Sequence, residues 1–378
     1  MKICFFNSGY LPDRGGVATL SGDLAEHMAR SPEVALVRVV AFKNSNPRIE
    51  RRDKLEIYAY GARRTWEMAV KIMWHVWRAR DFDVFHATNI FPVGFFVLIF
   101  AKFVLNKKVF LTIHGTDTIT TRGSRATRFL KRYTLRKCDG IIANSRSTAK
   151  LASGANQLPI SLFYPIYVGV DEQLFAMSAD DVRRRHGLGE RDFVVLTASQ
   201  LIRRKGVDNL IRAVAAIQDG DVRLLVLGKG PEEANLRRLA GDLQVADRVT
   251  FAGTVDHSRM GSYYRSSDIF ALTSRFIEEE GDVEGFGIVL LEAQYFGKPV
   301  IGTNSGGIPE TFRDKETGFL VAEGDTAAMT DRIMYLKDNP EAYARMSRAA
   351  GEFMREEFSW TTAIERHLEV YRMGHRMD

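Results

Sequence analysis

Short apolar runs alternate with longer amphipathic stretches along most of the chain, a pattern typical of α/β proteins. The chain opens on an apolar run at residues 2–7, followed by a loop with glycines and an amphipathic stretch at about 17–30. A strand, a loop and a helix in this order start a doubly wound domain, which binds ligands at the carboxyl ends of its strands. Further strands are predicted in the first half at 36–41, 56–60, 83–87, 109–113 and 140–144, and helices at 65–80 and 92–105.

The same alternation begins again in the second half, after an irregular segment at 161–192. Strands are predicted at 193–198, 222–227, 249–251, 269–272 and 300–302, and helices at 207–217, at 232–243, from about Ile288, and twice more near the end. The 378 residues also exceed what one hydrophobic core usually holds. We therefore predict an α/β protein of two doubly wound Rossmann-like domains, at 1–170 and 171–358, with a final helix in 359–378 that crosses back to the first domain.

Composition and cysteine content indicate the cellular compartment. Apolar residues make up 45% and charged residues 26% of the chain, and there are two cysteines, Cys4 and Cys138. Because no zinc-ligand spacing is present and no signal peptide precedes the first strand, a reduced, cytoplasmic protein is expected. The very apolar segment 92–105 is too short to span a bilayer and contains Lys102, which favours a core helix over one that dips into the membrane.

Charge is distributed unevenly between the two halves. Residues 1–170 contain 26 Lys and Arg against 12 Asp and Glu, a balance of +14, whereas the remainder has a balance of −8. Basic residues at helical spacing within 122–137 predict one basic helix face, which suits anionic lipid headgroups at the inner face of the cytoplasmic membrane. Nucleic acid fits less well, because Phe129 and Tyr133 are the only interleaved aromatics. A solvated basic face is the alternative.

The most informative stretch is GDVEGFGIVLLEAQYFGKPVIGTNSGGIPE, which carries Glu284 and Glu292 on either side of a Gly-Phe-Gly turn. A helix is predicted to start near Ile288, so that Glu284 lies in the loop before it and Glu292 about one turn inside. The start of a helix offers unpaired N–H groups to an anion such as phosphate, and a carboxylate accepts hydrogen bonds from a sugar diol. Two solvated surface acids are the alternative.

Three other positions place glycine or a titratable side chain at a strand end or at the start of a helix. Gly15 and Gly16 precede the first helix, and Lys205-Gly206 precedes a helix in the second half with two further arginines beside it. His114 follows directly after the predicted strand 109–113, with Asp117 three residues later, and a strand-end histidine is well placed to meet a substrate.

With these motifs the sequence resembles the retaining nucleotide-sugar glycosyltransferases of the GT-B fold, specifically glycosyltransferase family 4. The resemblance extends over essentially the whole chain, and GDVEGFGIVLLEAQ is similar to bacterial mannosyltransferases that use GDP-mannose and act on phosphatidylinositol mannosides. The motifs are the Gly15-Gly16 loop, His114-Gly115-Thr116-Asp117, Lys205-Gly206, Glu284 to Glu292, and Gly306-Gly307-Ile308-Pro309-Glu310.

The resemblance implies two domains facing a central cleft and a role for each motif. His114, Asp117 and Glu284 would form the catalytic group, with Glu284 on the hydroxyls of the transferred sugar and Glu292 on the ribose. The donor diphosphate would lie against Lys205, the glycine loop and the backbone at the helix start. The donor-binding set is Gly15, Gly16, Gln200, Arg204, Lys205, Glu284, Phe286, Gly287, Ile288 and Glu292.

The implied reaction moves a hexose from GDP-mannose or a UDP-sugar to a glycan or lipid-linked acceptor of cell-surface polysaccharide biosynthesis, with retention of configuration. The diphosphate itself would help to remove the acceptor proton, and no metal or other cofactor is expected, because lysine and helix N-termini stabilise the leaving group.

Gln200 departs from the family pattern. An arginine usually stands in its place, and losing one such phosphate contact costs roughly 2–4 kcal/mol of leaving-group stabilisation. Either Arg203 or Arg204 takes over this contact, or the activity is low. The segment 167–171 also differs from the usual Pro-Asn-Gly-Val-Asp, reading Tyr-Val-Gly-Val-Asp. Two other classes therefore stay open: a non-catalytic nucleotide-sugar-binding subunit, and an epimerase or phosphorylase of the same architecture.

Overall fold

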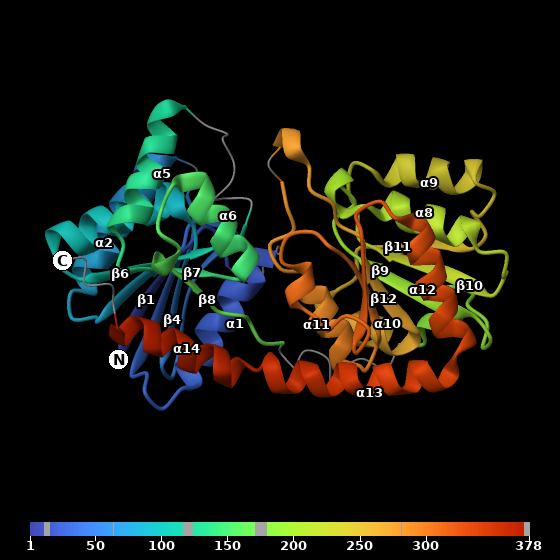
Figure 1. The fold of residues 1–378 in the computed structure, drawn as a ribbon. Helices are drawn as coiled ribbons and strands as arrows, with labels where there is room; N and C mark the ends of the chain where they lie inside the picture. The colour runs from blue at the N-terminus through green and yellow to red at the C-terminus, as the bar shows by residue number, and fades with distance from the viewer. Residues whose placement is uncertain (11–15, 63, 116–123, 171–179, 281, 374–378) are drawn as a thin grey trace. The chain divides into compact units, whose positions relative to one another are not determined.

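The computed structural model describes residues 1–10, 16–62, 64–115, 124–170, 180–280 and 282–373. The chain packs as two compact units (Figure 1). Unit 1 consists of Met1–Gly169 and Trp360–Asp378, and unit 2 is Val170–Ser359.

Unit 1 contains an eight-stranded sheet. Its strands are β1 (Lys2–Asn7), β2 (Leu36–Ala41), β3 (Lys43–Arg52), β4 (Leu55–Gly61), β5 (Val84–Ala87), β6 (Lys108–Ile113), β7 (Gly140–Ala143) and β8 (Phe163–Pro165). They lie in the order β3-β4-β2-β1-β5-β6-β7-β8, and every pair is parallel except β3 with β4. The predicted parallel core of this half is thereby confirmed.

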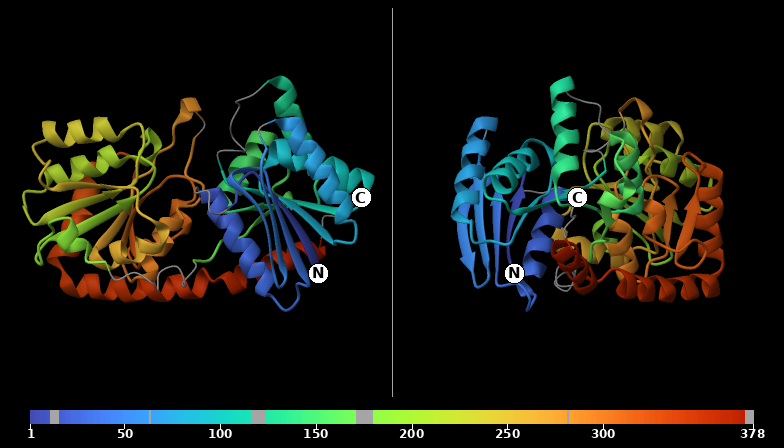
Figure 2. Two further views of the ribbon diagram at one scale, coloured as in Figure 1. Left: turned by 180° about the vertical axis from the view of Figure 1, so that it is seen from behind. Right: turned by 60° about the vertical axis from the view of Figure 1, so that its left-hand side comes forward.

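Helices cover both faces of this sheet, because alternate residues of its central strands point into two separate cores (Figures 1 and 2). Cys4 and Phe6 of β1 belong to one core, and Ile3 and Phe5 to the other. The first core is closed by α2 (Thr65–Arg78), η1 (Ile90–Gly94), α3 (Phe95–Val97), η2 (Leu98–Val104), α5 (Arg125–Lys137) and α6 (Arg146–Asn156), and the second by α1 (Gly16–Arg30) and α14 (Trp360–Met373).

Helix α14 packs into unit 1 at both of its ends. A Cβ on Gly169 would lie 2.5 Å from the backbone nitrogen of Trp360, so the chain passes the start of this helix at a distance that only glycine allows. The Trp360 ring stacks on His27 of α1 at 4.8 Å between centroids. At the other end, Lys108 donates to the carbonyl oxygens of Tyr371 and Arg372 at 3.2 and 3.0 Å, which places a cation at the helix C-terminus.

Some local predictions for this half were incomplete. The predicted helix 92–105 buries one face in the core, whereas Phe103 and Val104 near its end are exposed. Two π-helical segments interrupt it, and at Gly94 an added Cβ would meet Asn89 O at 2.5 Å. Strand β3 was missed because its sequence, KNSNPRIERR, is polar and largely exposed at the sheet edge. Strand β8 was missed because it has only three residues.

Unit 2 contains a six-stranded parallel sheet. Its strands are β9 (Phe193–Ala198), β10 (Val222–Leu227), β11 (Val249–Gly253), β12 (Ile269–Leu272), β13 (Val300–Thr303) and β14 (Gly318–Val321), in the order β11-β10-β9-β12-β13-β14. Its helices of seven or more residues are α8 (Val207–Ala216), α9 (Glu233–Asp242), α10 (Met260–Ser266), α11 (Ile288–Tyr295), α12 (Thr326–Asp338) and α13 (Pro340–Glu357). Five of the six strands were predicted, and β14 was not.

In each sheet the strand order reverses direction next to the first strand. The reversal lies between β1 and β5 in unit 1 and between β9 and β12 in unit 2. Loops that leave such neighbouring strands in opposite directions open a crevice at their carboxyl ends, where doubly wound sheets bind ligands. In the parts of the chain that the structure describes, no helix is both long and apolar enough to cross a membrane.

Candidate functional site

The carboxylate of Glu284 is held by three side chains at the strand reversal of unit 2. Its Oε2 accepts hydrogen bonds from Lys205 Nζ, from Arg204 Nη1 at 2.8 Å and from Ser274 Oγ at 2.9 Å. Arg204 Nε also lies 3.1 Å from Asp282 Oδ1. We call Lys205, Arg204, Ser274 and Glu284 the cation cluster; it joins the loop after β9 to the loop after β12.

The cation cluster keeps its acid ionised. Burial alone would raise the pKa of Glu284, but the charges of Lys205 and Arg204 and hydrogen bonds from Lys205 and Ser274 lower that pKa to about 2. Lys205 and Arg204 expose only 14% and 15% of their side chains, so their charges act in a poorly solvated place.

Two glycine turns fix the backbone around this cluster. Gly206 has φ 63°, and a Cβ there would lie 2.0 Å from Thr273 O, while Thr273 Oγ1 donates to Gly206 O at 2.9 Å. Gly306 has φ 55°, and its Cβ would lie 1.9 Å from Glu284 O, which also accepts the Gly307 N–H at 3.0 Å. Only glycine fits at either position.

Helix α11 begins directly after the cluster. Gly287 precedes it with φ 90°, no side chain caps it, and the first backbone bond runs from Leu290 N–H to Gly287 O at 2.9 Å. The N–H groups of Ile288 and Val289, which come before this first bond, therefore have no partner within the helix. Phe286 is buried and packs against Phe358. This end of α11 is suited to an anion such as phosphate.

Glu292 lies one turn inside α11 and is 6% exposed. Its Oε2 accepts a hydrogen bond from Tyr264 Oη at 2.6 Å. Burial raises the pKa of Glu292, and the charge of His257 and the Tyr264 hydrogen bond only partly oppose this. Glu292 is thus a buried hydrogen-bond acceptor whose orientation is fixed by Tyr264, whereas Glu284 is bound by two cations.

Gln200 lies in the loop after β9 with its side chain exposed. This loop is packed against the Gly228-Lys229-Gly230 loop, where a Cβ on Gly228 would meet Ser199 O at 1.8 Å and one on Gly230 would meet Leu201 O at 2.2 Å. Of the two arginines beside Lys205, Arg204 reaches Glu284, whereas Arg203 is exposed.

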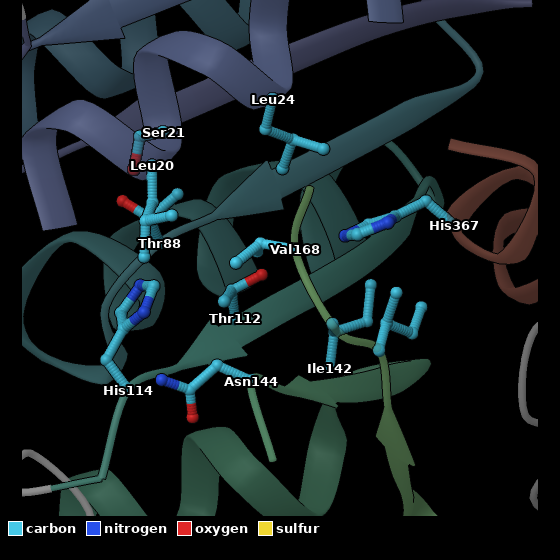
Figure 3. A pocket seen from close by; sticks show the side chains of 11 residues that line it. Leu20, Ser21, Leu24, Thr88, Thr112, His114, Ile142, Asn144, Val168 and His367 are labelled. Atoms are coloured by element: carbon cyan, nitrogen blue, oxygen red, sulfur yellow. The ribbon is translucent and has the colours of Figure 1, made fainter. Parts of the chain in front are cut away.

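In unit 1, His114 follows β6 and lines a small pocket (Figure 3). The pocket combines polar and apolar side chains from α1, from α14 and from the ends of β5, β6, β7 and β8. They are Leu20, Ser21, Leu24, Thr88, Thr112, His114, Ile142, Asn144, Ile166, Val168 and His367.

A buried histidine network lies beneath this pocket. His86 Nε2 is 2.6 Å from Thr112 Oγ1, and its Nδ1 is hydrogen-bonded to Tyr371 of α14. Burial, followed by the charges of His367 and His114, lowers the pKa of His86 well below its usual value. Burial also lowers the pKa of His367 to about 4, so both rings are neutral at physiological pH.

The structure thus brings together part of the predicted site. Arg204, Lys205 and Glu284 share one cluster, and Phe286, Gly287, Ile288 and Glu292 follow on the same loop and helix. His114 belongs to unit 1 and Gly16 begins α1. Gly15 and Asp117 lie outside the described residues.

Sequence reasoning missed Ser274, Asp282 and Tyr264 in unit 2, and Thr88, Thr112, Asn144 and His367 in unit 1.

Most of these omissions had a signal in the sequence. Ser274 and Thr88 follow closely after predicted strands, Thr112 and Asn144 lie at the ends of predicted strands, and Asp282 is two residues before Glu284. Tyr264 and His367 had none, since each comes from a distant helix. Within the described residues, no group of three or more His, Cys, Asp or Glu side chains is arranged to hold a metal ion.

Comparison with known protein families identifies the family to which the chain belongs. Residues 14–174 match Glycosyltransferase Family 4 and residues 178–353 match Glycosyl transferases group 1. The protein belongs to the glycosyltransferases of the family 4 type and has the GT-B fold, which confirms the resemblance drawn from its motifs.

Curated relatives and solved structures agree with this class. N-acetyl-alpha-D-glucosaminyl L-malate synthase of Bacillus anthracis is 28% identical over 304 residues, 79% of this chain and 77% of that protein. A GDP-mannose-dependent alpha-(1-6)-phosphatidylinositol monomannoside mannosyltransferase of Mycolicibacterium smegmatis is 37% identical over 207 residues, which is 53% of this chain and about half (54%) of that protein. Anabaena Alr3699/HepE, solved with UDP, has a TM-score of 0.78 at 21% identity, covering 99% of this chain and 100% of that one, and shares the fold.

Proposed function

We propose that this glycosyltransferase is a retaining hexosyltransferase, which moves a hexose from GDP-mannose or a UDP-sugar to a glycan or lipid-linked acceptor in cell-surface polysaccharide biosynthesis. The observation that carries the proposal is the cation cluster beside the start of α11. Two cations and a helix N-terminus converge there at the strand reversal of unit 2, where a nucleoside diphosphate would be held.

In this proposal the residues of unit 2 bind the donor. Lys205, Arg204 and the N–H groups after Gly287 hold the diphosphate. Glu292, oriented by Tyr264, accepts hydrogen bonds from the ribose hydroxyls, and Glu284 turns from the cations to hydroxyls of the sugar. Names of relatives support both donor classes, since one is GDP-mannose-dependent and a structural neighbour was solved with UDP-glucose.

In the reaction the bond between the anomeric carbon and the diphosphate oxygen breaks, and the acceptor oxygen bonds to that carbon from the same face. The acceptor proton passes to the departing diphosphate, so no protein base is required. Lys205 and Arg204 stabilise the negative charge that develops, without a metal cofactor. His114 and Asp117, together with the polar groups of the unit 1 pocket, bind the transferred sugar and the acceptor.

Arg204 is proposed to replace the arginine expected at position 200. It is one residue from Lys205, is largely buried and already binds a carboxylate, which is the chemistry that a phosphate requires. A non-catalytic nucleotide-sugar-binding subunit is the second candidate, and the exposed Gln200 is the observation that favours it.

We also propose peripheral contact with the anionic inner face of the cytoplasmic membrane. Six of the 13 residues of α5 are Lys or Arg and none is acidic, and Arg125, Arg128, Arg136 and Lys137 are exposed. The protein would then bind a lipid-linked acceptor at the membrane surface.

A thermal-shift panel with UDP, GDP, ADP and their hexose conjugates tests the donor proposal. A ligand present at a hundred times its dissociation constant adds about 2.7 kcal/mol of stability, which is a visible shift. We expect a response to one nucleotide class, and turnover of its conjugate with acceptor. Binding without transfer would support the non-catalytic candidate, and no response to any nucleotide would contradict the proposal.

A further inference from the structure

Helix α2 carries a row of large apolar side chains on its solvent face. Trp66, Val70, Met73, Trp74 and Trp77 are 61%, 52%, 48%, 45% and 58% exposed. At 3.6 residues per turn these positions fall within an arc of about 100°, so they form one continuous stripe along the helix. We call these five residues the tryptophan stripe.

The opposite face of α2 is already used. Met68, Ile72 and Val76 are buried in the core of unit 1, so the helix is anchored there without help from the stripe. The stripe side chains are 45–61% exposed, so they contribute little to the core. Exposed apolar surface of this kind marks a contact with another molecule or with a membrane.

Cations border the stripe. Lys71 and Arg78 lie along one edge of α2; the Arg78 guanidinium is 4.7 Å from the Trp74 ring, and that of Arg80 is 5.8 Å from the Trp77 ring. The segment α3 packs against both α2 and the basic helix α5, so the two helices belong to one side of unit 1. On α5, Phe129 is 68% exposed among the cations.

We infer that the tryptophan stripe is the surface by which unit 1 inserts into the headgroup region of an anionic phospholipid bilayer. This inference deepens the membrane contact proposed above and rests on it, but assigns the apolar part of that contact to α2 instead of α5. Tryptophan is suited to this boundary because its ring is largely apolar and its N–H is polar, and flanking Lys and Arg reach the phosphates.

A second copy of the chain fits the stripe less well than lipid does. In a two-fold contact, stripe would face stripe, and the edges that carry Lys71 and Arg78 would approach each other, each with one acid, Glu67, against two cations. Like charges would then oppose the contact, whereas anionic lipid neutralises them.

Tryptophan fluorescence tests the inference on the whole chain. The chain has four tryptophans; three are in the stripe and the fourth, Trp360, is buried at 5% exposure. Vesicles of phosphatidylcholine with phosphatidylglycerol should shift the emission to shorter wavelength, and brominated acyl chains should quench it. Pure phosphatidylcholine vesicles should give a much smaller effect.

Paired variants locate the surface. In a co-sedimentation assay, Trp66→Ser with Trp77→Ser should weaken binding to the anionic vesicles by about tenfold or more. The control is Ile160→Ser, an apolar residue of unit 1 that is 53% exposed and outside the stripe, and it should bind as the parent does. Circular dichroism of each variant should be unchanged, because the replaced side chains are surface-exposed.

Three results would overturn the inference: no binding of the parent to anionic vesicles, equal binding by the stripe variant, or a dimer in solution that the stripe variant abolishes. Nucleotide binding by thermal shift separates this outcome from the donor proposal. Stripe variants should keep the parent's nucleotide response, so loss of lipid binding alone leaves the donor site untouched.

Discussion

Arg204 donates to Glu284 at 2.8 Å, although 80 positions separate the two residues in the chain. The pair joins the loops that leave β9 and β12, and Lys205 binds the same carboxylate oxygen. The cations that we assign to the donor diphosphate are therefore neutralised by a carboxylate of the protein. A nucleoside diphosphate must compete with Glu284 for them.

Glu284→Gln should separate binding from transfer. The amide cannot neutralise Lys205 and Arg204, so free UDP or GDP should bind at least as tightly as to the parent. Isothermal titration calorimetry of the two proteins with the responding nucleotide measures this. Weaker binding to the variant would contradict competition between the carboxylate and the diphosphate.

Gly306→Ala should damage the site through the backbone. Its Cβ would lie 1.9 Å from Glu284 O at a φ of 55°, so the loop that carries Glu284 has to move. We expect a loss of about 1–3 kcal/mol in the free energy of unfolding and a larger loss of transfer. Gly324→Ala is the matched control, because Gly324 also has a positive φ, 76°, but open space at its Cβ. Equal effects on transfer would show that the contact with Glu284 is unimportant.

Changes at the two cations should lower activity, whereas a change at Gln200 should not alter it. Lys205→Ala should lower kcat by about 10²–10³-fold, as expected when one donor to a developing negative charge is removed. Gln200→Arg should give no gain in kcat or nucleotide affinity, and Arg204→Gln should lower both, because Arg204 is proposed to make the phosphate contact. A gain in Gln200→Arg would contradict Arg204 as the replacement. Steady-state kinetics of the three variants decide between these outcomes.

Acid should destabilise unit 1 through its buried histidines. The pKa of His367 is lowered to about 4 and that of His75 to about 3, in both cases first by burial. Because the unfolded chain binds these protons at about pH 6.5 and the folded one does not, this stability is complete above that pH and is lost as the pH falls toward the folded pKa values.

For His367 the shift corresponds to about 3 kcal/mol. Fluorescence-detected denaturation between pH 7 and pH 4 measures it, since all four tryptophans lie in unit 1. His367→Gln should flatten the pH dependence. An unchanged slope in this variant would mean that His367 is not the titrating group.

Much of the fold was readable from the sequence because most strands of these parallel sheets are short, uninterrupted apolar runs. The strands 2–7, 36–41, 193–198, 222–227 and 269–272 were predicted with the bounds observed. Strand β3 could not be predicted, because an exposed edge strand needs no apolar alternation. The π-helical segments around α3 depend on close packing at Gly94, which a sequence pattern does not reveal.

The candidate site was readable to the same extent. Gly206, next to Lys205, and Gly287, three residues after Glu284, have φ values that other residues avoid, so the glycine pattern located these two turns. The direct contact of Glu284 with both cations was not foreseen, because it depends on how two loops from distant strands meet. Tyr264, the partner of Glu292, comes from α10 and left no local pattern.

The most direct test of the account is release of nucleoside diphosphate, coupled to glycosylated product, from the responding donor. It should be measured for the parent, for Glu284→Gln and for Glu278→Gln, an exposed acid of the same loop. We predict turnover by the parent and the Glu278 variant, and a loss of about 10²-fold or more in the Glu284 variant. Full turnover by Glu284→Gln would contradict the central claim that the cation cluster is the donor site.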